Sequence, residues 1–203
     1  MTEITSEAEL EALYDAPVPT SILKEVDYIT DDYRKLIEAS PFAILATSGP
    51  EGLDCSPRGD PSGFVRVADR KTLMIPDRRG NNRIDSLRNI VLDPRVALLF
   101  LIPGIGTTMR VNGWAKLTAD PDLCTTFVME GKNPKCVIVI TVERAYTQCQ
   151  KAIARSRLWD PAMHIPKSTL PTVGEIMERL SKGDFDGKAY DAEYPERMKR
   201  TIY

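Results

Sequence analysis

The sequence predicts a mainly β fold of the α+β class, in which six or seven strands form a closed or half-closed barrel. Two observations carry this prediction. Between residues 41 and 149, short β-like runs alternate with clusters of Gly, Pro and Asp, and only two helical patterns interrupt them. A doubly wound parallel sheet would need a helix in almost every connection, so it is disfavoured. The predicted strands are 42–47, 53–56, 63–67, 72–75, 96–102, 108–117 and 135–147.

The two helices predicted within the barrel cover residues 82–92 and 120–131. In the first, Asn82 and Asp85 are spaced like a capping box, and Ile84, Leu87 and Val91 are expected on one buried face. In the second, an Asp at the N-cap precedes a Pro at the first helical position.

Helical segments are predicted on both sides of the barrel, and the whole chain, 1–203, is expected to be one domain. In the N-terminal segment, 1–40, Ser6 and Thr30 are the expected N-caps. The core is 41–149, and the C-terminal extension, 150–203, contains a helix over 150–156 and a second helix that opens on a capping box at Thr172 and closes at Gly183. The charge-rich segment after Gly183 is expected to pack on a neighbour, such as a partner subunit.

Composition limits the classes of partner. The chain of 203 residues has a formal net charge of −2 and a pI near 5.6, which argues against binding to nucleic acid or to an anionic membrane. Its apolar runs are too short for transmembrane helices, and its first residues do not resemble a signal peptide. The four cysteines show no CxxC spacing, and the one histidine, His164, is given no role. Reduced thiols and a cytoplasmic location are therefore expected.

The most informative stretch is Pro76-Asp77-Arg78-Arg79-Gly80-Asn81-Asn82-Arg83, between a predicted strand and a predicted helix. Three guanidiniums lie close to a helix N-terminus, where backbone N–H groups lack intrahelical partners, and Gly80 permits a positive φ. This loop is interpreted either as a phosphate cradle or as a solvated turn with surface arginines. Arg78 and Arg79 are expected to be solvated neighbours of the site.

Three further groups of residues have two readings each. Arg58 follows a strand and either points into a pocket or pairs with Asp60 at a β-bulge. One face of a later strand carries polar residues that either meet solvent or line a cavity, and Lys151, Arg155 and Trp159 recur every four residues. The last group could bind an anionic aromatic ligand or simply be part of a surface helix. Neither a P-loop nor a Rossmann motif is present.

Three motifs together resemble the pyridoxamine 5′-phosphate oxidase-like flavoproteins, over roughly residues 30–160. They are Ser56-Pro57-Arg58-Gly59-Asp60, the Pro76 to Arg83 loop, and Arg110-Val111-Asn112-Gly113. With the tail segments Leu170 to Ile176 and Tyr194 to Arg197, they are similar to a subgroup of that family whose substrate is unknown. The resemblance implies a split barrel and a homodimer that binds FMN in two clefts at the subunit interface.

The resemblance also implies a set of cofactor contacts. Arg83 would be the principal ligand of the FMN phosphate, Thr108 and Arg110 would approach from the opposite subunit, and Lys151 and Trp159 would cover the ring. The full set of cofactor residues implied in this way is Arg58, Ile75, Pro76, Asp77, Asn81, Asn82, Arg83, Thr108, Arg110, Lys151 and Trp159.

The chain departs from the oxidase itself. The oxidase has Arg-Xaa-Val-Leu-Leu-Lys where this chain reads Ser56 to Pro61, and its C-terminal Trp and Arg-Leu-Xaa-Pro pattern is not reproduced. Oxidation of pyridoxamine 5′-phosphate is therefore not expected. The resemblance implies an FMN-dependent oxidoreductase acting on an unknown small molecule, with redox chemistry at the flavin and no catalytic side chain assigned.

Three alternatives remain open at this point. A non-catalytic flavin- or haem-binding protein, or a redox sensor, could use the same barrel, and so could a deazaflavin-dependent reductase. A nucleic-acid-binding barrel would require aromatic residues interleaved on its binding strands. The strands near Arg58 and Arg83 carry almost none, so this last alternative is disfavoured.

Overall fold

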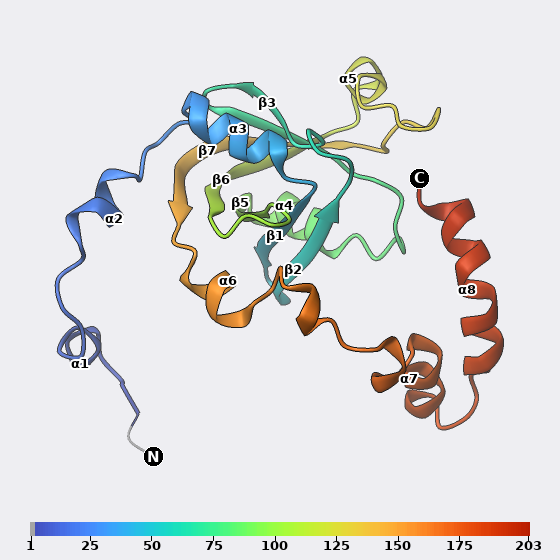
Figure 1. Ribbon diagram of the computed structural model, residues 1–203. Coiled ribbons are helices and arrows are strands. Elements are labelled where there is room, and N and C mark those ends of the chain that lie inside the picture. Colours follow the sequence, from blue (N-terminus) through green and yellow to red (C-terminus); the bar gives the residue numbers. More distant parts are fainter. Residues whose placement is uncertain (1–2) are drawn as a thin grey trace.

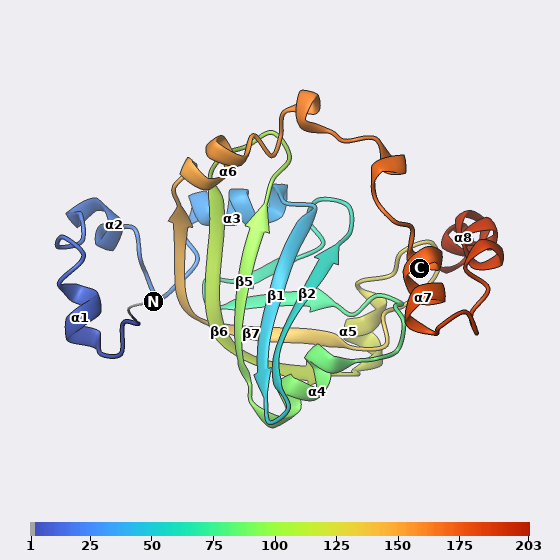
Figure 2. The same cartoon turned by 90° about the horizontal axis from the view of Figure 1, so that it is seen from below.

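A coiled antiparallel sheet of seven strands forms the body of the protein in the computed structural model, which describes residues 3–203. The strand order is β2-β1-β5-β6-β7-β4-β3, with β2 and β3 at the two edges, so the barrel is not closed (Figures 1 and 2). The split barrel of seven strands is thus confirmed. The strands are Phe42–Gly49 (β1), Gly52–Gly59 (β2), Arg66–Asp69 (β3), Thr72–Pro76 (β4), Arg95–Leu101 (β5), Thr108–Thr118 (β6) and Val137–Gln148 (β7).

The core lies inside the barrel, because every second side chain along its strands is buried there. In β5, Val96, Leu98 and Phe100 are buried while the residues between them are partly exposed, and β1 alternates in the same way at Ala43 and Leu45. Successive side chains of a strand point to opposite faces, so this period of two places one row inside. A one-residue slip in register would turn that row outward, so the buried row fixes how β1 and β5 pair.

Short helices cover the outside of the barrel and flank it. They are Glu7–Glu11 (α1), Pro19–Leu23 (α2), Asp31–Ala39 (α3), Asp85–Leu92 (α4), Pro121–Thr125 (α5), Lys151–Ser156 (α6), Val173–Leu180 (α7) and Gly187–Thr201 (α8). The predicted caps at Ser6 and Thr30 are confirmed, since each side chain accepts a hydrogen bond from an N–H of its helix. Within the described residues, none of the helices has the length and apolar character needed to cross a membrane.

Helix α4 begins later than predicted. Asn82 and Ile84 have positive φ angles of 60° and 55°, so the helix starts at Asp85 and the expected capping box does not form. The shifted start turns a different face inward: Ser86 and Ile90 are buried against the barrel, whereas Ile84 and Val91 are 47% and 71% exposed. Of the three residues predicted on the buried face, only Leu87 packs against the core; Val91 is exposed, and Ile84 lies at the N-cap.

Helix α5 is also shorter than predicted. Its N-cap is as expected, because the Asp120 carboxylate accepts the Leu123 N–H at 2.8 Å. The helix ends at Thr125, however, and the chain then turns back through a bridge between Met129 and Lys132, with positive φ at Glu130 and Gly131. The left-handed pair at this turn is incompatible with a helix running to Gly131.

The C-terminal extension runs from α6 across the barrel, so that α7 and α8 lie on the side opposite to α1 and α2 (Figures 1 and 2). The capping box at Thr172 and Glu175 that opens α7 is confirmed. Helix α8 packs on α7 where Gly174 and Gly187 meet: a Cβ atom on Gly174 would lie 2.2 Å from the Gly187 carbonyl oxygen. The charge-rich segment from Asp184 to Tyr203, for which the sequence predicted no secondary structure, is largely α8.

Replacing Gly113 with alanine is expected to lower the free energy of unfolding by at least about 1–3 kcal/mol. Gly113 lies at a register shift between β6 and β7, and its added Cβ would lie 2.2 Å from the Thr141 carbonyl oxygen. Urea denaturation measures the loss. Gly80→Ala is the matched control, because a Cβ there meets nothing within 4 Å. Equal stability of the two variants would contradict this account of the bulge.

Candidate functional site

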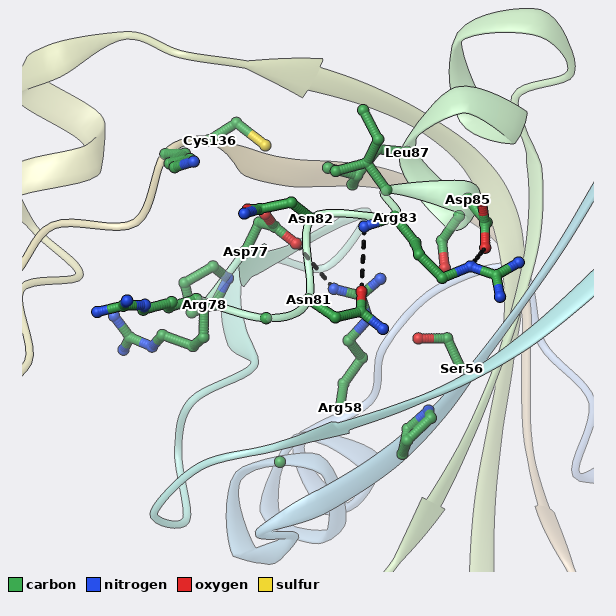
Figure 3. Close-up of a pocket in the computed structure, with 18 of the residues that line it drawn as sticks. Ser56, Arg58, Asp77, Arg78, Asn81, Asn82, Arg83, Asp85, Leu87 and Cys136 are labelled. Atoms are coloured by element: carbon green, nitrogen blue, oxygen red, sulfur yellow. Dashed lines mark hydrogen bonds and ion pairs between the residues drawn. The ribbon is translucent and has the colours of Figure 1, made fainter. Parts of the chain in front are cut away.

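A cleft of about 880 Å³ opens between β2, the end of β4, the loop that follows it and the start of α4. Figure 3 shows Arg58, Asp77 and Asn81 pointing toward one another across its floor. Such a volume is in the range of small-molecule and cofactor sites. The charged residues lining it are Asp54, Arg58, Asp60, Asp77, Arg78, Arg79, Arg83, Asp85 and Lys135.

One face of β2 supplies a wall of the cleft. Asp54, Ser56 and Arg58 are partly buried and line it, whereas the residues between them, including Cys55, are exposed. The Arg58 Nη1 atom lies 2.9 Å from the Asp77 Oδ1 atom, and both side chains are largely buried. The Arg58 Nε atom is buried and has no hydrogen-bond partner among the described residues. Arg58 therefore lines a pocket, and its alternative pairing with Asp60 is wrong.

Asp60 pairs instead with Arg78. The Arg78 Nε atom lies 2.6 Å from Asp60 Oδ2, and Arg78 Nη1 donates to the Phe127 carbonyl oxygen at 2.6 Å. The Asp60 carboxylate is fully buried and the Arg78 side chain is only 17% exposed. The expectation that Arg78 is a solvated neighbour is thus wrong, because the end of β2 and the chain after α5 both bind it. Arg79 is exposed, as expected.

The loop from Gly80 to Ile84 leads into an uncapped helix. The Asn81 side-chain oxygen accepts the Arg83 N–H at 3.1 Å, and the residue at the N-cap of α4, Ile84, provides no capping hydrogen bond. The first N–H groups of a helix without a cap are available to an anion. Gly80 does not have a positive φ, contrary to expectation; Asn82 and Ile84 have it instead.

Arg83 lies next to this helix start. Its side chain is 76% exposed and its Nε atom lies 2.8 Å from Asp85 Oδ2. An exposed ion pair of this kind contributes little to the free energy of unfolding, so another anion can readily replace the Asp85 carboxylate as the partner of Arg83. The guanidinium and the uncapped N–H groups together can bind a phosphate. Among residues 3–203, no group of three or more His, Cys, Asp and Glu residues is placed to hold a metal ion.

Cys136 lines the cleft near Asp77, whose N–H donates to the Cys136 carbonyl oxygen at 2.9 Å. Burial, and then the negative charge of Asp77, raise the pKa of the Cys136 thiol to about 11. Because only the thiolate reacts, we expect iodoacetamide at pH 8 to alkylate Cys136 at least about tenfold more slowly than exposed Cys55. The rate should rise with pH toward 11. Peptide mass spectrometry measures both rates, and equal rates at pH 8 would contradict the assigned pKa.

A family model described as pyridoxamine 5′-phosphate oxidase matches residues 29–149, which is more than half of the chain. The chain belongs to the pyridoxamine 5′-phosphate oxidase family. A search of the curated proteins found no match.

Solved structures resemble the split barrel of this family member. The HupZ protein of Group A Streptococcus is 21% identical, with 60% of this chain and 94% of that chain covered and a TM-score of 0.49. A single-residue variant of HupZ is 23% identical; the match covers 59% of this chain and 99% of that chain, with a TM-score of 0.47. A third match is a Clostridium acetobutylicum protein related to general stress protein 26, of the pyridoxinephosphate oxidase family. It is 13% identical; the match covers 58% of this chain and 86% of that chain, with a TM-score of 0.44.

The cofactor residues expected from family resemblance fall into two groups in the structure. Arg58, Pro76, Asp77 and the stretch Asn81 to Arg83 line the cleft, and Ile75 lies directly beside them with a side chain that is fully buried in the core. The structure therefore brings together the residues predicted from β2, β4 and the loop. Of Ile75, only the backbone is in a position to contact a cofactor in the cleft.

The other four expected residues of this family member lie away from the cleft within one chain. Thr108 and Arg110 line a second groove, of about 350 Å³, on the face of β1, β5 and β6. Lys151 is exposed at the start of α6, and the Trp159 Nε1 atom donates to the Ile105 carbonyl oxygen at 2.9 Å. Helix α6 ends at Ser156, so Trp159 does not continue the four-residue repeat.

Sequence reasoning missed several residues that line the cleft. Asp54 and Ser56 could have been found, because they share a strand face with Arg58 at a spacing of two. The Ser86 hydroxyl donates to Asp54 at 2.5 Å, which joins α4 to β2. Tyr203 could not have been found, since its contact with Asp60 joins residues 143 positions apart.

Proposed function

We propose that this member of the pyridoxamine 5′-phosphate oxidase family binds FMN in the cleft and is an FMN-dependent oxidoreductase. The observation that carries the proposal is the anion site at the start of α4, where Arg83 and an uncapped helix N-terminus lie beside Asn81 and Asn82. A phosphate monoester there would meet a cation and oriented N–H donors. Arg83, Asn81 and Asn82 are the proposed phosphate ligands.

The rest of the cleft fits a flavin as well. Arg58, held by Asp77, keeps a buried Nε–H donor without a partner among the described residues. An unpaired buried donor is costly, so an acceptor on a ligand would stabilise the site. Pro76 and Asp77 form the border along which the ring system would lie. When bound, FMN supplies hydride transfer; the cation of Arg58 would favour its anionic reduced form.

The second groove supports a homodimer. Thr108 and Arg110 border an apolar surface that includes Ile44, Leu99 and Ile153. We propose that a second copy of the chain covers this surface, which would bring Thr108 and Arg110 to the cleft of the other subunit. Size-exclusion chromatography with light scattering tests the dimer: a monomer at micromolar concentration would contradict it.

The absorption spectrum of the purified chain tests the cofactor. We expect flavin bands, retained after FMN is added and the protein is desalted. A band near the haem Soret region, or retention of a deazaflavin but not of FMN, would favour the alternatives and overturn the FMN assignment. A chain that holds FMN but reduces or oxidises nothing with NAD(P)H, oxygen and a substrate panel would instead be a non-catalytic flavin carrier.

A further inference from the structure

The last two residues of the extension reach the same cleft. Ile202 and Tyr203, which follow α8, line it together with Asp60 and Arg78. The Tyr203 hydroxyl donates to Asp60 Oδ1 at 2.6 Å, and the Lys132 Nζ atom donates to the Tyr203 backbone oxygen at 2.7 Å. The Tyr203 ring centroid lies 5.7 Å from the guanidinium carbon of Arg78. The extension is thus attached to the cleft by a small, polar contact.

The Asp60 carboxylate is held in place by Arg78, whether or not the extension is docked. Its buried carboxylate accepts from Arg78 on one oxygen and from Tyr203 on the other. If Tyr203 leaves, the charge of Asp60 stays paired with Arg78, and water can replace the tyrosine hydroxyl. Undocking of Tyr203 therefore leaves no isolated buried charge, and the contact can open and close reversibly.

Helices α7 and α8 pack chiefly against each other rather than against the barrel. The Asp191 carboxylate accepts from the Thr172 hydroxyl at 2.5 Å and from the Gly174 N–H at 3.0 Å, which joins α8 to the start of α7. In both views the pair stands beside the barrel (Figures 1 and 2). Because Tyr203 supplies much of the attachment of α8 to the barrel, loss of its contact would let α8 and the residues after it open locally more often.

We propose that α8 with Ile202 and Tyr203 is a lid on the cleft, and that the Tyr203–Asp60 hydrogen bond holds this lid closed. Tyr203 contacts the cleft at Asp60 and Arg78. Figure 3 shows Arg78 at the end of the site away from Arg83, so this is the end that the lid would cover. Ligand entry and release at that end require Tyr203 to leave Asp60. The identity of the covered ligand as FMN rests on the proposed function, whereas the lid itself does not.

The lid is expected to stay closed through the neutral range. The hydrogen bond to Asp60 is the main cause that raises the pKa of Tyr203; burial and Glu130 act in the same direction, and Arg78 opposes them. Because the raised pKa belongs to the docked state, docking is fully stabilised below the ordinary tyrosine pKa and weakens as the pH rises through the raised value. Asp60, Arg78, Glu130 and Lys132 are the charged groups that face Tyr203.

Hydrogen–deuterium exchange of the full chain without ligand tests the lid. Tyr203→Phe keeps the ring and removes only the donor, so we expect amides in 187–203 to exchange about five- to tenfold faster, with the β strands unchanged. Tyr194→Phe is the matched control, since it makes the same change within α8, in the same segment as Tyr203, at a hydroxyl that makes no hydrogen bond within residues 3–203. Unchanged exchange of 187–203 in Tyr203→Phe would overturn the lid.

A second readout reports access to the cleft and needs no flavin. Alkylation of Cys136 is expected to be several-fold faster in Tyr203→Phe than in the wild type, while exposed Cys149 reacts at the same rate. Equal Cys136 rates would overturn the covering role even if 187–203 exchanged faster. With FMN as the probe, the dissociation rate should rise by the same factor. A chain that shows both flavin-free effects but binds no FMN would overturn the proposed function and retain the lid.

Discussion

Replacing Arg83 with alanine is expected to weaken FMN binding by about 10- to 100-fold, because a charge-assisted hydrogen bond contributes about 1.5–3 kcal/mol. Arg83 lies beside the uncapped start of α4, where the phosphate is proposed to bind. Its side chain is exposed and, among residues 3–203, pairs with Asp85 alone, so the free energy of unfolding should change by less than about 1 kcal/mol. Quenching of flavin fluorescence on titration measures the affinity.

Arg88→Ala is the matched control for Arg83→Ala. Arg88 is also an exposed arginine and lies on α4, but it does not line the cleft. The two variants remove the same charge from the same region of the protein, so a general electrostatic effect would weaken both equally. Equal loss of FMN affinity in the two variants would remove Arg83 from the phosphate site.

Replacing Arg58 with methionine is expected to abolish measurable FMN binding and to lower the free energy of unfolding by about 1–3 kcal/mol. Removing one partner of a fully buried ion pair costs about 3–5 kcal/mol. The Arg58 and Asp77 side chains are 17% and 16% exposed, so a smaller loss of stability is expected here. Urea denaturation and flavin titration measure the two effects.

The double variant Arg58→Met with Asp77→Leu separates these two effects. Without an unpaired carboxylate beside the cleft, we expect most of the lost stability to return. FMN binding should not return, because the cation and its donors are still missing. Recovery of binding along with stability would mean that Arg58 serves only the fold, and that its pairing with Asp77 explains its position completely.

The barrel was predictable because residues close together in the sequence determine its strands and turns. Apolar runs mark β1 and β5 in the sequence, polar and apolar residues alternate at the start of β6, and turn residues separate the strands. The start of α4 and the end of α5 were not predictable, because left-handed residues such as Ile84 and Glu130 decide them, whereas the end of α4 at Leu92 and the N-cap of α5 at Asp120 were predicted correctly. A β-branched residue rarely takes that conformation, so tertiary contacts must impose it at Ile84.

The site was predictable only in part, for the same reason. Arg58 and the loop ending at Arg83 are recognisable because each motif is contiguous. The contact from Asp60 to Arg78 and Tyr203 joins three distant parts of the chain, and no sequence pattern indicates it. The placement of Thr108 and Arg110 against a flavin depends on a second subunit, and it stays a prediction.

Parallel titration of the wild-type chain with FMN and with riboflavin tests the central claim most directly, because the two ligands differ only in the phosphate. The account predicts that FMN binds at least about 100-fold more tightly, as expected for a charged group held by Arg83 and a helix N-terminus. Equal affinities for FMN and riboflavin, or binding of neither, would contradict a phosphate site at the start of α4.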